Sequence, residues 1–119
     1  MEYRDLVNCL VDSVANYSKW GFDRFLKLHN SNENISEELV CGEQSRCNLQ
    51  CWVMQHYVSG NEDWIDVFVI VNDEDMKIGS NITLHRDGMV EISGDIFLHT
   101  FNGLPKRIGS MEVKGKSGG

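Results

Sequence analysis

Four cysteines are the residues of this sequence most able to bind a metal or form a disulfide: Cys9, Cys41, Cys47 and Cys51. Cys47 and Cys51 are expected on one strand, where four residues span about 13 Å. Thiolates that share one ion lie at roughly 2.3 Å from it, and a disulfide needs Cα atoms within about 7 Å, so this pair can do neither. We therefore predict no metal and no cofactor. The chain begins without an export signal, so we expect four free thiols in a reducing compartment.

The four histidines, His29, His56, His85 and His99, form no HExxH pair. In one of two strand registers His56 would lie opposite Asp66, like a general base beside the carboxylate that orients it. The sequence places no nucleophile or second acid to complete such a site. We predict no catalytic residues and expect that the protein is not an enzyme.

Three short motifs imitate known functional sites without their context. His85-Arg86-Asp87 copies the kinase catalytic triplet but falls in a predicted hairpin turn. Gly115-Lys116-Ser117 copies the end of a phosphate-binding loop, yet the upstream Gly109 is one residue too far away. Asp73-Glu74-Asp75 lacks the spacing and the glycine of an EF-hand. None of the three predicts a ligand.

Length and composition are typical of one globular domain. A chain of 119 residues can bury a single core, and no apolar run approaches the ~18 residues of a membrane span. The N-terminal stretch MEYRDLVN has mixed charge and is not a signal peptide. We expect a single domain over residues 1–114, a flexible tail over 115–119, and a cytoplasmic location without membrane binding.

The net charge of −7 is concentrated in one segment. Residues 28–76 hold ten acidic residues and one basic residue. Contact with phosphates needs clustered lysines and arginines, so nucleic acid is disfavoured as a partner and a basic protein is favoured. The alternative is that the acidity only keeps the protein soluble.

The stretch 49–72 predicts the central hairpin of an antiparallel sheet. Gly60-Asn61 forms a two-residue turn, and apolar residues alternate on both sides of it. Ile65, Val67 and Val69 belong to a β-branched row that marks the core face. The pairs expected across the turn are Ser59–Glu62, Tyr57–Trp64, Gln55–Asp66 and Val53–Phe68 on one face, and His56–Ile65, Met54–Val67 and Trp52–Val69 on the core face.

The flanking segments predict an α+β fold. Apolar spacing indicates a helix over residues 2–30, with a kink or a break at Gly21. Residues 31–46 are expected as a loop, or as a short helix over 37–41. A second hairpin should turn at residues 86–88, and Pro105 should begin an edge strand. The predicted fold is an N-terminal helix, or helix pair, packed on one face of a five- to six-stranded antiparallel meander.

The outward face of the central hairpin combines aromatic rings with carboxylates, the composition of a protein-docking hot spot. The alternative is that a further element covers these rings as core. The residues predicted to bind a partner are Tyr57, Glu62, Asp63, Trp64, Asp66, Asp73, Glu74 and Asp75.

In its size, its order of helix then meander and its acidic segment Glu33–Asp75, the chain resembles the immunity proteins of bacterial toxin–immunity systems, such as contact-dependent growth inhibition. Phage-borne inhibitors and secretion chaperones are similar at this level. The resemblance implies a monomer or weak dimer that blocks a cognate basic toxin or effector, such as a nuclease domain. It includes no motif, so no residue roles carry over. The rival interpretation is a small ligand-binding or enzymatic domain with His56, His85 or His99 in a pocket between helix and sheet.

Overall fold

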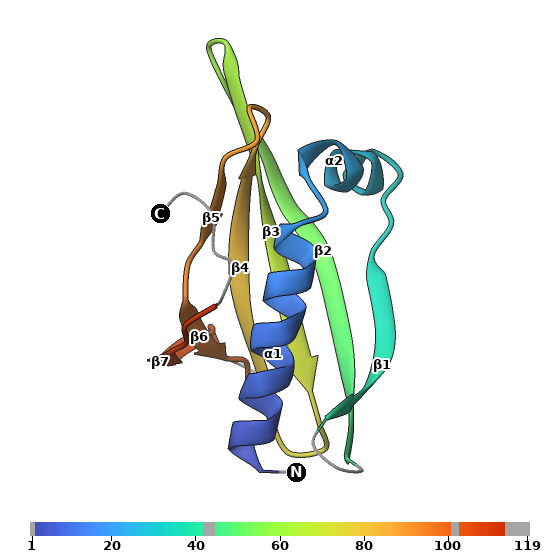
Figure 1. Cartoon of the computed structure of the whole chain (residues 1–119), viewed down its shortest axis with the longest axis vertical. Coiled ribbons are helices and arrows are strands. Elements are labelled where there is room, and N and C mark those ends of the chain that lie inside the picture. Colours follow the sequence, from blue (N-terminus) through green and yellow to red (C-terminus); the bar gives the residue numbers. More distant parts are fainter. Residues whose placement is uncertain (1, 42–44, 101–102, 114–119) are drawn as a thin grey trace.

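The computed structural model describes residues 2–41, 45–100 and 103–113 (Figure 1). These residues form two helices packed on one antiparallel sheet of seven strands. This confirms the α+β class, although the sheet has more strands than expected. The predicted tail, 115–119, lies outside the described residues. The elements are α1 (Tyr3–Ser18), α2 (Phe22–Asn30), β1 (Ile35–Cys41), β2 (Ser45–Ser59), β3 (Glu62–Asn72), β4 (Lys77–His85), β5 (Val90–Ile92), β6 (Asp95–Leu98) and β7 (Lys106–Ser110).

The predicted helical segment is two helices that meet at Gly21. This residue has a φ of 89°, which L-residues with a side chain rarely adopt, so the chain breaks there instead of kinking. α1 buries one stripe of residues at three- and four-residue steps: Leu6, Leu10, Val14 and Tyr17. Neither helix is long and apolar enough to cross a membrane.

The sheet has the order β1-β2-β3-β4-β6-β7, and the short strand β5 also pairs with β4. Both helices lie on the same face of it (Figure 1). The β-branched row predicted for the core faces these helices, since Ile65, Val67, Val69 and Val71 are all 0% exposed. We call the other side of the sheet, which neither helix covers, the open face, although Phe68 and Ile70 on it are buried.

Residues 35–41 form an edge strand, β1, so the prediction of a loop or short helix was wrong. The strand pairs with β2 along its whole length, from Ile35 opposite Cys51 to Cys41 opposite Ser45. The strand signal is hidden in the sequence because Glu37 takes a helix-facing position where an apolar residue would be expected. Its carboxylate is exposed, so an acid is tolerated there, and it accepts a hydrogen bond from the hydroxyl of the buried Tyr17 of α1.

A bulge in β2 changes half of the predicted pairing of the central hairpin. Next to the turn the predicted pairs Tyr57–Trp64 and Gln55–Asp66 are confirmed. The register then shifts between Val53 and Gln55, so that Met54 has no partner on β3. One extra residue moves every later side chain to the other face. The pairs beyond the shift are therefore Val53–Val67 and Trp52–Phe68, and those predicted for Val53, Met54 and Trp52 were wrong.

The second hairpin has the predicted form. Leu84 pairs with Val90 and Ile82 pairs with Ile92, and Gly88 has a φ of 100°. After Pro105, β7 forms the other edge of the sheet and pairs with β6. Asn102, half of the turn signal predicted between these strands, lies outside the described residues.

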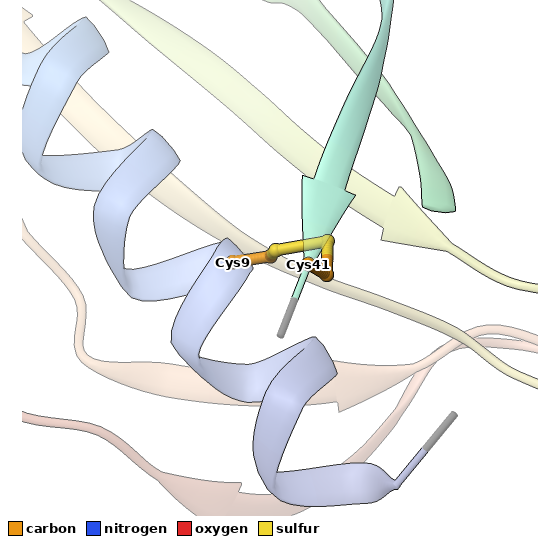
Figure 2. Close-up of a disulfide and its surroundings, with 2 residues drawn as sticks. All are labelled: Cys9 and Cys41. Carbon is orange, nitrogen blue, oxygen red and sulfur yellow. A yellow bond between two sulfur atoms is a disulfide. The ribbon is translucent and has the colours of Figure 1, made fainter. Parts of the chain in front are cut away.

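Cys9 of α1 and Cys41 of β1 form a disulfide (Figure 2), with 6.0 Å between their Cα atoms. The prediction of four free thiols was therefore wrong for these two residues. It rested on the expected compartment, and nothing in the sequence shows that α1 lies over the end of β1. Cys47 and Cys51 are free, buried and on one strand, as expected.

Candidate protein-docking surface

A row of three rings crosses the open face near the tip of the central hairpin. Tyr57, Trp64 and His85 are directly opposite one another on β2, β3 and β4. The Tyr57 and Trp64 rings stack with centroids 5.6 Å apart, and His85 lies 6.0 Å from Trp64. Tyr57 and Trp64 are half-buried, and both helices pack on the other face. Cross-strand pairing thus holds the rings in a fixed arrangement.

A second aromatic row crosses the same face farther from the tip. Trp52 stacks on Phe68 with centroids 5.7 Å apart, and His99 contacts Phe68 edge-on at 5.1 Å. Gly79 on β4 leaves room for Phe68, because a Cβ atom there would lie 2.6 Å from its ring. Sequence reasoning missed this row, since Trp52 reaches the open face only through the bulge.

A polar row separates the two aromatic rows. Gln55, Asp66 and Thr83 are cross-strand neighbours, and the Thr83 hydroxyl donates a hydrogen bond of 2.9 Å to the Asp66 carboxylate. Asp66 is therefore held in place beside Trp64 by a polar partner, and no cationic side chain among the described residues pairs with it. A fixed, half-buried carboxylate between rings is well placed to receive a cationic side chain.

The distal part of the β2–β3 hairpin extends beyond the rest of the molecule (Figure 1). It exposes apolar side chains as well as rings, with Val58 69% and Met54 54% exposed. We define the hairpin surface as the open-face residues of this part that sequence reasoning had selected: Tyr57, Glu62, Trp64 and Asp66.

Asp63, although next to these residues, is engaged within the protein. Its carboxylate accepts two hydrogen bonds from the Arg86 guanidinium, at 2.6 and 2.7 Å, and lies 2.9 Å from Nε2 of His56. Its side chain is only 11% exposed. The hydrogen bonds from Arg86, followed by the bond with His56, lower the pKa of Asp63 to about 2. Its charge is already balanced, so little of it remains for a partner.

The predicted residues Asp73, Glu74 and Asp75 lie at the opposite end of β3. One carboxylate oxygen of Asp73 accepts hydrogen bonds from the backbone N–H groups of Asp75 and Met76, which shapes the loop to β4. Glu74 and Asp75 are exposed. The ten-residue rise along β3 separates this loop from Glu62 by about 33 Å. The predicted acidic site is thus two separate groups.

The histidines of the rival interpretation are divided between the two faces of the sheet. His56 lies on the helix side, 5.9 Å from the Phe22 ring, whereas His85 and His99 contact rings of the open face. Burial, and to a smaller degree the charge of Lys77, lower the pKa of His99. Of the three, only His56 lies on the side where a pocket between helix and sheet could form. The cavity of about 280 Å³ between α1 and β1 has no histidine in its lining.

Comparison of the chain with protein-family models, with curated proteins and with solved structures found no match.

Proposed function

We propose that this is a bacterial, cytoplasmic immunity protein, an inhibitor that binds one basic toxin or effector and covers its working surface. A nuclease domain is the favoured target, because its phosphate-binding lysines and arginines would match an acidic partner. The observation that carries the proposal is the hairpin surface, in which two stacked rings and two carboxylates share a face that neither helix covers.

The rings would supply affinity and the carboxylates orientation. Trp and Tyr anchors commonly account for 2 kcal/mol or more of a protein interface. The stacking of Tyr57 on Trp64 fixes both rings before binding, so little conformational entropy would be lost. Glu62 and Asp66 would attract a basic partner and select its orientation.

The size of a standard interface favours contact with only one of the two acidic groups. A typical patch covers about 800 Å² on each partner, roughly 30 Å across. The hairpin surface and the loop at Asp73–Asp75 are about as far apart as that whole width. We propose that the hairpin surface contacts the partner, and that Glu74 and Asp75 act only through their long-range field.

Titration calorimetry with the purified product of the neighbouring gene tests the aromatic part of the proposal, because inhibitors of this kind are encoded beside their targets. Trp64→Ala should weaken binding about 30-fold, the equivalent of 2 kcal/mol. Tyr3→Ala, which removes an exposed ring on α1, is the control and should leave the affinity unchanged. Equal affinity of the Trp64 variant and the wild type would refute the role of the hairpin surface.

The rival proposal, a small ligand-binding domain, makes a different prediction. A pocket protein should gain thermal stability with a small molecule in a metabolite screen, whereas an inhibitor should gain it only with its protein partner. A ligand-dependent rise in Tm that Trp64→Ala leaves intact would favour the rival.

A further inference from the structure

Three cysteine sulfurs from three elements meet at one end of the molecule. Cys9 comes from α1, Cys41 from β1 and Cys47 from β2, and their sulfur atoms all lie within 4.8 Å of one another. The pairing of β1 with β2 explains the second and third positions. Cys41 lies opposite Ser45, and Cys47 lies opposite Leu39, so the two cysteines are diagonal neighbours on the helix-facing side.

The fourth cysteine is excluded from this group by the same register. Cys51 pairs with Ile35 at the other end of β1, about 13 Å along β2 from Cys47. It is buried and free, like Cys47. The chain thus contains its own matched control: two buried thiols on one strand, one inside the cluster and one outside it.

We propose that the reduced protein binds one Cu(I) ion through the thiolates of Cys9, Cys41 and Cys47. Three sulfurs at about 2.3 Å from a central ion lie roughly 4 Å from one another, so the observed separations need only small side-chain movements. Among the described residues no histidine or carboxylate belongs to the cluster. Soft thiolate ligands suit both Cu(I) and zinc, but a closed zinc site needs four protein ligands, and the described cluster offers three, which is enough for Cu(I).

The disulfide makes this site dependent on redox state. The Cys9–Cys41 bond consumes two of the three ligands (Figure 2), so the oxidised protein should not hold the ion. A dithiol reductant would break the S–S bond by supplying two electrons and two protons, and would itself be oxidised to a disulfide. Binding of Cu(I) would then displace the protons of the thiols that ligate it.

The site is independent of the proposed inhibitory function. Cys41 lies at the end of β1 remote from the tip of the β2–β3 hairpin (Figure 1). A bound ion would link α1 to both strands, much as the disulfide links α1 to β1. A failure to bind copper would therefore not count against the docking proposal, and a failure to bind a partner protein would not count against the copper site.

Anaerobic titration of the reduced protein with Cu(I), against a chromophoric Cu(I) chelator, tests the proposal. Wild type and Cys51→Ala should each bind one ion with equal affinity. Cys47→Ala should bind at least about 100-fold more weakly, because even the loss of an outer-shell partner weakens metal sites 10- to 100-fold. The oxidised wild type, with its disulfide intact, should not compete with the chelator.

X-ray absorption of the copper-loaded wild type needs no variant and counts the ligands directly. Three sulfur neighbours are expected. Two sulfurs, or a nitrogen or oxygen ligand, would overturn the assignment. So would Cys47→Ala binding as tightly as Cys51→Ala, or oxidised protein binding as tightly as reduced protein.

Discussion

Asp63 connects the central hairpin to the second hairpin and to α2. Arg86, in the turn after β4, holds the Asp63 carboxylate with two hydrogen bonds, and its guanidinium also lies 4.6 Å from the centre of the Phe22 ring of α2. His56 approaches the same carboxylate from β2. A carboxylate that must be ionised to keep three elements together makes the fold sensitive to acid.

The first prediction concerns the acid stability of Asp63→Asn. The pKa of Asp63 is lower in the folded protein, about 2, than its ordinary value of 3.8. Its stabilising effect is therefore complete above the ordinary value and is lost as the pH falls towards 2. Between about pH 4 and pH 2 the urea midpoint of the wild type should fall more than that of Asp63→Asn.

Asp12→Asn, which alters an exposed carboxylate of α1, is the control and should follow the wild type. Parallel curves for the wild type and Asp63→Asn would contradict the assigned role.

The second prediction concerns Gly79, which lies beneath the second aromatic row. A Cβ atom there would lie 2.6 Å from the Phe68 ring and 2.9 Å from the Ile70 side chain. Gly79→Ala should therefore lower the free energy of unfolding by about 1–3 kcal/mol, as overpacking usually does. In Gly109→Ala an added Cβ would lie 3.9 Å from the Tyr3 hydroxyl, an ordinary van der Waals contact, so this control should cost much less. Denaturant unfolding compares the two variants.

At the scale of elements, features set by local chemistry could be predicted from the sequence. The Gly60-Asn61 turn and the bulged form of the second hairpin depend on residues within a few positions of one another. Gly21, Gly60 and Gly88 all have the positive φ that such turns and breaks need. The helix break and the hairpin pairings next to each turn follow from them.

Features set by distant contacts could not be predicted. The strand β1 depends on pairing with β2, and its Glu37 accepts a hydrogen bond from Tyr17 of α1. No short-range pattern in the sequence shows that β2 pairs with β1 or that Tyr17 contacts Glu37. No glycine in the sequence indicates the bulge at Met54. Because of this bulge Trp52 lies on the open face and not on the predicted core face. The strand pairing at the candidate site was therefore predictable near the turn and wrong beyond the bulge.

The third prediction concerns the link between α1 and β1. The disulfide joins cysteines 32 positions apart, and closing a loop of that length in the unfolded chain stabilises a fold by about 3–4 kcal/mol in the entropic model. Under oxidising conditions Cys41→Ala should lose most of this amount relative to the wild type. Under reducing conditions the difference should shrink to the packing cost of one small side chain.

Cys51→Ala provides the comparison, since Cys51 is buried without a disulfide. Its effect on the unfolding free energy should be the same with and without reductant. A Cys41→Ala deficit that reductant fails to change would show that the disulfide contributes no stability.

At the scale of the whole molecule, the acidic residues of β3 and of the loop after it lie towards the two ends of a body 45 Å long. The sequence showed that the acidic residues cluster along the chain. It could not show that β3 separates Glu62 and Asp66 from Asp73, Glu74 and Asp75 in space. The hairpin end combines charge with rigid rings, and the loop end has charge beside Arg46. A partner protein of ordinary size is expected to bind the hairpin end.

The most direct test compares charge reversal at the two ends in calorimetric binding to the purified product of the neighbouring gene. Glu62→Lys with Asp66→Lys and Glu74→Lys with Asp75→Lys change the net charge equally. The first pair should weaken binding by about 30-fold or more, and the second by no more than about 3-fold through the long-range field. A greater loss from the second pair, or unchanged affinity for both, would contradict the proposal that the hairpin surface binds a basic protein.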